Sequence, residues 1–238
     1  MYQTFLLDID NTLLDFDAAE KRGLKKVIES YGVEYDSGML KEYKKLNRNL
    51  WDLLEQGKIS RDVLLNTRFG EFFRLYQIEA SGTEAEARFR RLLGDSSDLI
   101  PNVKETLLQL KKMGKQLYTA SNGVYSTQIQ RLTNAGIHDL FDGMFISEQV
   151  GYEKPSPYFF EYCFNNIPDF EKEKAVMVGD SISSDIKGAA DAGMDSCLFL
   201  RSEKPVPSNA THTIRDISEL INLKISPPTP ETDPESSG

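Results

Sequence analysis

Two aspartates, Asp8 and Asp10, stand one residue apart at the end of the apolar run 5–7. Such a run predicts a buried strand, and removing carboxylates from water at its end costs free energy unless a partner compensates for it. The turn after a strand can bring one carboxylate and the backbone carbonyl of the other residue to a single point. Mg²⁺ prefers such hard oxygen ligands. The segment is therefore a candidate magnesium site.

A calcium-binding loop is one alternative for the same aspartates, because Asp8-x-Asp10 also opens an EF-hand loop. That loop requires glycine at its sixth position and glutamate at its twelfth. Leu13 and Ala19 occupy these positions, which excludes an EF-hand. A pair of surface acids at the end of a strand remains as the simpler alternative.

Two further segments carry polar groups that suit a phosphoryl site. In Ser121-Asn122-Gly123 the small residues allow backbone N–H groups to approach a phosphoryl oxygen, and the serine hydroxyl adds another donor. Lys154 stands just before Pro155 and a predicted helix start. Taken separately, each has an ordinary interpretation, because Ser-Asn-Gly is a common turn and a lysine is usually a solvated surface cation.

A fourth segment repeats the pattern of the first, with an apolar run at 175–178 followed by Gly179-Asp180. Another aspartate, Asp185, follows five residues later near a predicted helix start. The carboxyl ends of parallel strands gather at one edge of an α/β sheet. We therefore expect the polar groups of the four segments to meet there, namely Asp8, Asp10, Ser121, Lys154 and Asp180.

The order of these four motifs resembles the haloacid dehalogenase (HAD) superfamily, specifically its Mg²⁺-dependent phosphatases. The resemblance extends from residue 4 to about residue 223. A closer similarity, to bacterial HAD-type pyrimidine 5′-nucleotidases, is carried by segments 7–16, 47–51, 145–151 and 179–181. Asn11 stands where many relatives carry glycine, and Ser121 stands where close relatives often carry threonine. Neither departure removes a catalytic functional group.

The resemblance implies a role for each candidate residue. It assigns Asp8 as the nucleophile that forms an aspartyl-phosphate, and it assigns Mg²⁺ binding to Asp8, the backbone carbonyl of Asp10 and Asp180. Lys154 would stabilise the charge on the transferring phosphoryl group, and Asp185 would orient Lys154 or a metal-bound water. The phosphoryl oxygens would be held by three adjacent residues, Ser121, Asn122 and Gly123.

The charges of the site indicate how Asp10 works. A phosphate monoester adds about two negative charges to an edge that already holds Asp8 and Asp180, whereas Mg²⁺ and Lys154 return three positive charges. A further ionised carboxylate would be poorly tolerated, so we expect Asp10 to be protonated when the substrate binds. Asp10 would then act as the general acid for the leaving alkoxide and as the base for the attacking water.

The whole composition narrows the class of protein. The chain has 238 residues and a net charge of −9, which argues against nucleic-acid polymers and anionic membranes as partners. The sequence contains no apolar run as long as a membrane span, no basic-then-apolar leader and no GxxxxGK[ST] phosphate loop. The only cysteines, Cys163 and Cys197, fit a reducing compartment, although their spacing leaves contact between them open. We expect a cytoplasmic monomer or dimer that acts on a small phosphomonoester such as a nucleoside monophosphate.

The elements that must position these residues alternate along most of the chain. Strand-like runs separated by helical patterns predict an α/β fold with a Rossmann-like, doubly wound parallel sheet. The runs lie at 5–7, 116–120, 144–146, 175–178 and 197–200. We expect this HAD core to comprise residues 1–15 and 96–225, with an all-helical cap at 16–95 inserted after the first strand. The segment 226–238 lacks apolar side chains and is predicted to be a flexible tail.

The predicted cap consists of four helices with apolar residues at helical spacing. Asp17 with Glu20 forms the pattern of a capping box for the first helix. Ser60 is expected to open the third helix, and Thr83 with Glu86 is expected to cap the fourth. A cap that closes over the sheet edge must supply the groups that recognise the leaving group, because the core residues contact only phosphate and metal.

Three residues of the predicted cap are candidates for that recognition. Trp51 could stack on a planar base, Asn47 could match the donor and acceptor edge of uracil or thymine, and Phe16 lies at the crossing from core to cap. Each has a structural alternative. Trp51 could belong to the core of its helix, Asn47 could lie on a solvated helix face, and Phe16 could serve hinge packing.

Other functions share parts of this pattern. Hydrolytic dehalogenation needs no Mg²⁺ and has no alkoxide to protonate, so Asp10 argues against it. A sugar phosphomutase, or a phosphatase for a sugar phosphate or phosphoglycolate, would use the same catalytic residues, and only the cap resemblance argues against these. A non-catalytic protein that binds phospholigands would usually have lost a charged site residue, whereas all are present here, namely Asp8, Asp10, Lys154 and Asp180.

Overall fold

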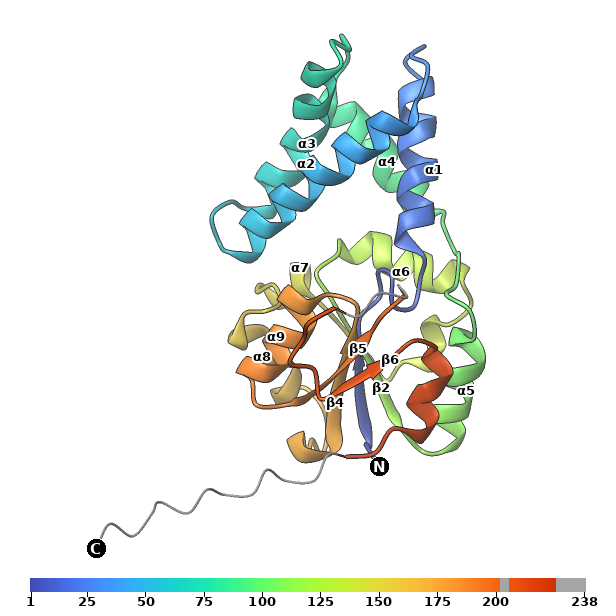
Figure 1. The fold of residues 1–238 in the computed structure, drawn as a ribbon, viewed down its shortest axis with the longest axis vertical. Coiled ribbons are helices and arrows are strands. Elements are labelled where there is room, and N and C mark those ends of the chain that lie inside the picture. Colours follow the sequence, from blue (N-terminus) through green and yellow to red (C-terminus); the bar gives the residue numbers. More distant parts are fainter. Residues whose placement is uncertain (202–205, 226–238) are drawn as a thin grey trace, which may run out of the picture.

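A parallel sheet and a separate group of four helices make up the structure (Figure 1). This computed structural model describes residues 1–201 and 206–225. The tail predicted at 226–238 lies outside the described residues. Within the described ranges, no helix has the length and apolar character needed to cross a membrane.

The sheet of the described residues has six strands, all parallel, in the order β3-β2-β1-β4-β5-β6. The chain runs from β1 to one edge and then returns to build the other edge, so the order reverses beside β1. A reversal of this kind opens a crevice at the carboxyl ends of the strands. The strands are β1 (Thr4–Leu7), β2 (Gln116–Ser121), β3 (Gly143–Ile146), β4 (Ala175–Gly179), β5 (Asp195–Phe199) and β6 (His212–Ile214). The predicted doubly wound parallel sheet is confirmed, whereas β6 was not predicted.

Both faces of the sheet are covered, as the side chains of β1 show. Phe5 and Leu7 point into one apolar cluster with α5 (Val103–Lys112) and η4 (Ile217–Asn222). Leu6 points into the opposite cluster, which includes residues of α8 (Pro157–Asn165) and α9 (Lys187–Asp191). A strand that is buried on both faces reads as a continuous apolar run, which is why the run 5–7 was recognisable in the sequence.

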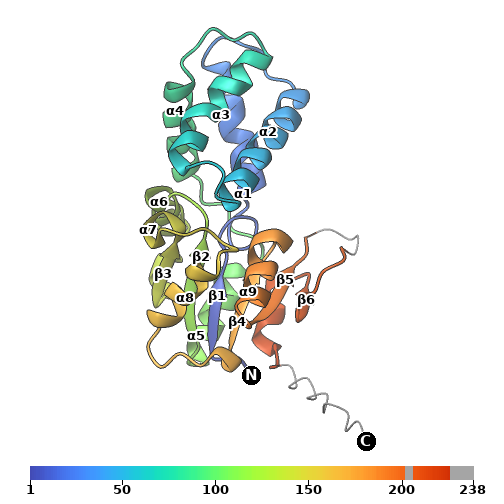
Figure 2. The ribbon, with the colours of Figure 1, turned by 90° about the vertical axis from the view of Figure 1, so that its left-hand side faces the viewer.

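The remaining helices follow the strands in the order typical of a doubly wound sheet (Figure 2). Pro157 occupies the first helical position of α8, as predicted. Cys163 and Cys197 are free, buried and in clusters on opposite faces of the sheet. These helices are α6 (Tyr125–Asn134), α7 (Ser147–Val150), α8 (Pro157–Asn165) and α9 (Lys187–Asp191), with short turns η1 (His138–Leu140), η2 (Lys172–Lys174) and the π-helical η3 (Ile182–Ile186).

The four helices between β1 and α5 form a group that we call the four-helix unit. They are α1 (Phe16–Glu29), α2 (Ser37–Glu55), α3 (Arg61–Leu75) and α4 (Gly82–Gly94). Their shared core is rich in aromatic rings, which meet mostly edge to face with centroids 5.0 to 6.4 Å apart. The unit therefore has an apolar cluster of its own, separate from those of the sheet. The rings belong to Tyr43, Phe69, Phe72, Phe73, Tyr76 and Phe89.

Two chain segments lead from the sheet to the four-helix unit and lie side by side. Leu14 and Leu99 form an antiparallel bridge. The Asp15 N–H donates to the Asp98 carbonyl at 2.9 Å, and the Ile100 N–H donates to the Leu13 carbonyl at 3.0 Å. We call these two hydrogen-bonded segments, 13–15 and 98–100, the stem.

The helix starts of the unit differ in part from the prediction. Ser60 caps α3 as expected, accepting from the Val63 N–H at 3.2 Å. The cap of α1 is Asp15 rather than Asp17, and the cap of α4 is Ser81 rather than Thr83. In both helices the residue with a non-helical backbone lies two positions earlier, and its side chain accepts from an N–H three residues on. The glutamates assigned to the capping patterns, Glu20 and Glu86, are instead buried within the unit.

Candidate active site

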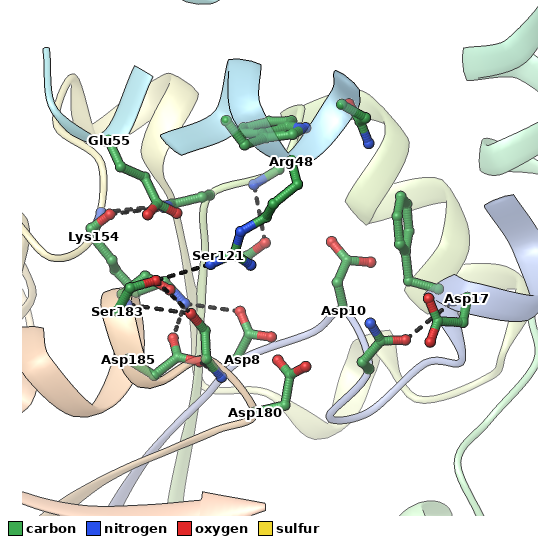
Figure 3. A pocket seen from close by; sticks show the side chains of 18 of the residues that line it. Asp8, Asp10, Asp17, Arg48, Glu55, Ser121, Lys154, Asp180, Ser183 and Asp185 are labelled. Atoms are coloured by element: carbon green, nitrogen blue, oxygen red, sulfur yellow. Dashed lines mark hydrogen bonds and ion pairs between the residues drawn. The ribbon is translucent and has the colours of Figure 1, made fainter. Parts of the chain in front are cut away.

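The carboxyl ends of β1, β2 and β4 bring most of the predicted residues together, as Figure 3 shows. Asp8 directly follows β1, Ser121 is the last residue of β2, and Asp180 directly follows β4. The Asp8 N–H donates to the Val178 carbonyl at 2.8 Å, so the backbone ladder extends to the aspartate itself. Asp8 is buried, with only 7 % of its surface exposed. Its carboxylate is thus fixed by the sheet.

Lys154 joins the strand ends through its ammonium group. Its Nζ donates to Asp8 Oδ1 at 2.8 Å, to Asp185 Oδ1 at 2.6 Å and to the Ala120 carbonyl at 2.5 Å. All three ammonium protons therefore have acceptors, and the side chain is fully buried. Lys154 is not a solvated surface cation, which was the simple interpretation of the sequence.

Asn122 positions the backbone of Lys154. The Lys154 N–H donates to Asn122 Oδ1 at 2.8 Å, and Asn122 Nδ2 donates to the Lys154 carbonyl at 2.9 Å. The amide side chain of Asn122 thus satisfies both the backbone N–H and the backbone carbonyl of Lys154, as the backbone of a neighbouring β-strand would. The Asn122 side chain therefore supports Lys154, and only the backbone N–H of Asn122 remains as a candidate phosphoryl donor.

Three carboxylates lie close enough to share a cation. One oxygen from each of Asp8, Asp180 and Asp185 lies within 4.8 Å of the others. Burial raises the pKa of Asp180 to about 7, and repulsion from Asp185 adds to this effect. Burial also raises the pKa of Asp8, and repulsion from the other carboxylates raises it further. Lys154 lowers this pKa but offsets only part of the increase. A bound divalent cation would relieve this repulsion, so the residues present fit a magnesium ion.

Both carboxylate oxygens of Asp185 accept hydrogen bonds from other groups of the protein. One of its oxygens accepts from Lys154, and the other accepts from the Ser181 N–H at 3.0 Å. A Cβ atom at Gly179 would lie 2.0 Å from Asp185 Oδ2, so the glycine before Asp180 is required for this close approach. For Lys154, burial lowers the pKa, but Asp185 and Asp8 outweigh burial and hold its pKa above the ordinary value. These contacts agree with the expected role of Asp185 as an orienting residue.

Asp10 has partners that the sequence did not predict. Gln128 Nε2 donates to Asp10 Oδ2 at 2.7 Å and to Ser121 Oγ at 3.0 Å. The buried guanidinium of Arg131 forms an ion pair with the other oxygen of Asp10 and stacks over Phe16, 5.7 Å from the ring centroid. The charge balance drawn from the sequence did not include Arg131, which places a further positive charge beside Asp10. Both new residues lie three positions apart on α6, so they share one helix face directly after the Ser-Asn-Gly segment.

The Ser121 to Gly123 segment forms a turn that is closed by a hydrogen bond of its own. The Gly123 N–H donates to Ser121 Oγ at 3.1 Å. A Cβ atom at Gly123 would lie 2.5 Å from Gln128 Nε2, so only glycine lets the glutamine reach both Asp10 and Ser121. Glycine at position 123 is thus needed for the close approach of Gln128, whereas the expected approach of the backbone N–H groups to a phosphoryl oxygen stays a prediction.

Asn11 explains one departure from the family pattern. Its φ is +59°, in the left-handed region that glycine adopts freely and asparagine tolerates better than most residues. Its side-chain oxygen accepts from the Asp17 N–H at 3.1 Å. Asparagine therefore meets the backbone requirement of this turn.

A cavity of about 970 Å³ lies above the carboxylates. Its lining comes both from the strand ends and from the four-helix unit, so the site is built from two parts of the structure. Trp51, Asn47 and Phe16 all line it. Asn47 is buried, so its expected alternative position on a solvated helix face is wrong. Trp51 also packs with the apolar cluster around Leu50, so its packing and its place in the cavity are compatible.

A buried polar network forms the far side of this cavity. Asn47 Nδ2 donates to Glu20 Oε1 at 3.1 Å, and Asn47 Oδ1 accepts from Arg68 Nη1 at 3.1 Å. Arg68 also makes a bidentate pair with Glu86, at 2.6 and 2.7 Å. Glu20 further lies 3.7 Å from the ammonium of Lys44. The amide of Asn47 keeps one N–H and one acceptor position beyond these bonds.

Glu20 gives the protein an expected pH-dependent stability. Burial raises its pKa from 4.5 to about 7. Between these pH values the folded protein retains a proton that the unfolded chain has released, so the free energy of unfolding falls as the pH rises. This shift corresponds to about 3 kcal/mol. We expect Glu20→Gln to stabilise the protein near pH 8 by up to this amount and to have little effect below about pH 4.5.

Chemical unfolding of both proteins at the two pH values measures this difference. Glu29→Gln is the matched control, because Glu29 lies exposed on the same helix. A stability difference for Glu20→Gln that stays constant with pH would contradict the assignment.

The fold and the site define a hydrolase of the haloacid dehalogenase type. The family model for haloacid dehalogenase-like hydrolases matches residues 2–193, and the chain belongs to this family. Its relatives include phosphatases and a 5′-nucleotidase, and the chain is an enzyme of the phosphatase type. The predicted family resemblance is thereby confirmed.

Three relatives cover nearly the full chain. The HAD-hydrolase YfnB of Bacillus subtilis is 38 % identical over 93 % of this chain and 95 % of its own length. The pyrimidine 5′-nucleotidase PynA of Streptococcus pneumoniae is 36 % identical over 93 % of this chain and 94 % of its own. A glyceraldehyde 3-phosphate phosphatase of Methanothermobacter thermautotrophicus is 31 % identical over 94 % of each chain.

A crystal structure of YfnB has the same fold. It superposes with a TM-score of 0.88 at 37 % identity and covers 93 % of this chain and 99 % of YfnB. That structure is described as bound to magnesium and as revealing interdomain movement.

Proposed function

We propose that this chain is a magnesium-dependent, cytoplasmic 5′-nucleotidase that removes phosphate from pyrimidine nucleoside monophosphates such as UMP, dUMP and dTMP. The observation that carries the proposal is the buried carboxylate of Asp8, which Lys154 holds at one end of a cavity of about 970 Å³. A cavity of this size has room for a nucleoside monophosphate. Similarity to PynA along nearly the whole chain supports a pyrimidine nucleotide as the substrate.

In the proposed reaction, an oxygen of Asp8 attacks the phosphorus atom and the bond to the leaving oxygen breaks. The product is an aspartyl-phosphate, which divides one difficult step into two easier ones. Ser121 Oγ and the backbone N–H groups of Asn122 and Gly123 hold the phosphoryl oxygens. Lys154, which is already hydrogen-bonded to Asp8, balances the negative charge that develops on the phosphoryl oxygens.

Asp10 supplies and removes the proton. It donates a proton to the leaving alkoxide and then takes one from the water that attacks the phosphorus atom of the aspartyl-phosphate. The bond between phosphorus and the Asp8 oxygen breaks in this second step, which releases phosphate and restores the Asp8 carboxylate. Gln128 and Arg131 fix the direction of its carboxyl group in the structure. A general acid must lie within hydrogen-bond reach of the leaving oxygen, and Asp10 lines the same cavity as Asp8.

The proposed magnesium site consists of Asp8, the backbone carbonyl of Asp10 and Asp180. When bound, Mg²⁺ neutralises charge on the phosphoryl oxygens and orients the phosphate for attack. Asp185, both of whose oxygens already accept hydrogen bonds, orients Lys154. The magnesium-bound crystal structure of YfnB supports the choice of this metal.

The four-helix unit is the proposed cap that reads the leaving group. Trp51 offers an aromatic face in the cavity, and Asn47 keeps one donor and one acceptor position for the edge of a pyrimidine. The Phe16 ring is covered by the Arg131 guanidinium on one side, so packing near the stem is its main role. The interdomain movement described for YfnB supports a cap that moves relative to the sheet.

Substrate preference separates this proposal from the second candidate, a phosphatase of sugar phosphates or phosphoglycolate. The similarity to a glyceraldehyde 3-phosphate phosphatase favours that candidate. We expect kcat/KM for dUMP and dTMP to exceed that for dAMP, glucose phosphates and phosphoglycolate by about 10-fold or more, because a polar edge and an aromatic face discriminate against groups that leave them unpaired. A purine or sugar phosphate that is preferred tenfold over every pyrimidine would contradict the proposed specificity.

A further inference from the structure

An arginine of the four-helix unit reaches across to the loop that follows β2. Arg61 Nη1 donates to the carbonyl of Asn122 at 3.1 Å and to that of Gly123 at 2.6 Å. Its Nη2 donates to Ser147 Oγ at 2.5 Å and to Glu153 Oε1 at 3.1 Å. The guanidinium thus connects the loops after β2 and β3 with the residue that precedes Lys154.

The contact with the two carbonyls fixes the direction of an N–H group. A trans peptide unit points its carbonyl and its N–H in opposite directions. The Asn122 carbonyl belongs to the same peptide unit as the Gly123 N–H, so binding that carbonyl on one side turns the N–H to the other. In the structure this N–H points to Ser121 Oγ, 3.1 Å away. Because a glycine backbone rotates easily, the orientation of this peptide unit is held from both sides, by the Ser121 hydroxyl at its N–H and by Arg61 at its carbonyl.

The place of Arg61 in its own helix indicates that these contacts determine its position. Ser60 caps α3, and Arg61 is the first helical residue. A cation at the amino end of a helix is disfavoured by the helix dipole. The side chain is nevertheless largely buried, with 11 % of its surface exposed, and lies 5.9 Å from the centroid of the Trp51 ring. Contacts with the sheet side of the cavity offset this unfavourable local setting.

We propose that Arg61 is a positioning residue that aligns the Gly123 N–H of the anion-binding turn only while the four-helix unit contacts the sheet. Phosphoryl binding and the position of the four-helix unit are then coupled, because the same guanidinium serves both. The inference rests on the proposed function only in treating the 121–123 turn as the phosphoryl site. It is independent of which leaving group the enzyme prefers.

Other contacts between the four-helix unit and the sheet provide a comparison. Arg48 Nη2 donates to Ser183 Oγ at 3.1 Å, and its side chain is 61 % exposed. Glu55 accepts from Asn122 Nδ2 at 3.2 Å. Neither touches a carbonyl of the 121–123 turn in the described structure. Arg48→Gln thus removes a contact between the two parts that leaves the turn untouched, and we expect it to lower phosphate affinity much less than Arg61→Gln does.

The test measures binding of inorganic phosphate to the full-length protein with Mg²⁺ by calorimetry, and hydrolysis of p-nitrophenyl phosphate. For Arg61→Gln we expect phosphate affinity and kcat/KM to fall by about 10-fold to 100-fold, as for a displaced binding group. Arg61→Lys keeps the charge but cannot bridge two carbonyls with a planar fork, so we expect a similar loss. Arg74→Gln, exposed on the same helix, is the control with the same chemical change.

Two further measurements keep the test decisive. Thermal unfolding of each variant identifies misfolding. If Arg61→Gln is misfolded, the phosphate affinity of Arg61→Lys is compared with that of the wild type instead. Added guanidinium ion should restore part of the phosphate affinity of Arg61→Ala, a result that a purely adhesive role would not produce. Unchanged phosphate affinity in folded Arg61→Gln and Arg61→Lys, or equal losses in Arg48→Gln, would overturn the inference. A wild-type enzyme that binds phosphate but prefers sugar phosphates would refute only the proposed specificity.

Discussion

Asp8→Asn is expected to lower kcat for every phosphate monoester by at least about 10⁴-fold, the scale seen when a catalytic nucleophile is removed. Asparagine has the same shape as aspartate and can still accept the hydrogen bond from Lys154 through its carbonyl oxygen. It lacks the charge and nucleophilicity needed to form an acyl-phosphate. The loss should therefore appear in kcat while the fold is retained.

Steady-state kinetics with dUMP and a thermal unfolding curve measure these two expectations. Mass spectrometry after rapid quenching should detect a phosphorylated wild-type peptide containing Asp8 and no such peptide in the variant. The paired control is the wild-type enzyme with excess chelator, in which activity should disappear and return with added Mg²⁺. Near-normal turnover in the variant, or in chelator, would refute the mechanism.

Asp10→Asn is expected to have the second largest effect, and the effect should depend on the leaving group. General acid catalysis contributes about 10²-fold to 10⁴-fold when a poor leaving group must be protonated. The alkoxide of a nucleoside is such a group, whereas p-nitrophenolate leaves without protonation. We therefore expect a much larger loss of kcat for dUMP than for p-nitrophenyl phosphate.

The ratio of the two losses is the informative quantity, because it cancels damage common to both substrates. Gln128 and Arg131 donate to different oxygens of Asp10, so an asparagine at position 10 can accept only one of the two bonds and turns its amide NH₂ toward the other donor. This damage is common to both substrates. Equal losses for both substrates, with formation of the aspartyl-phosphate shown to limit the rate, would argue against an acid role for Asp10.

The residues that the sequence predicted lie where strand topology alone decides their place. Asp8, Ser121 and Asp180 stand at the ends of apolar runs, and parallel strands necessarily bring such ends together. Lys154 also meets Asp8, although it lies on a loop eight residues after the end of β3, and its place was predicted from the same gathering of strand ends. Local patterns of apolar residues predicted the alternation of strands and helices. The same kind of pattern predicted helices between the first and second strands.

The residues that the sequence did not predict act through contacts between helices and loops. Arg131 and Arg61 look like ordinary charged residues of amphipathic helices, and only tertiary packing turns them towards Asp10 and towards the turn at Gly123. The short strand β6 was missed because two of its three residues are not buried, so its apolar signal is weak. At α1, Asp15 and Asp17 both suited the cap, and propensity could not choose between them.

The stem gives the chain an unusual kind of modularity. The four-helix unit enters and leaves the sheet through the paired segments 13–15 and 98–100, joined by the Leu14–Leu99 bridge. If the residues between the two stem segments are replaced or extended, the stem segments themselves stay hydrogen-bonded at the same separation. The strand register and the position of Asp8 are then unaffected. The four-helix unit, our proposed cap, can therefore be exchanged without rebuilding the sheet that carries Asp8, provided that the new unit also supplies a contact equivalent to that of Arg61.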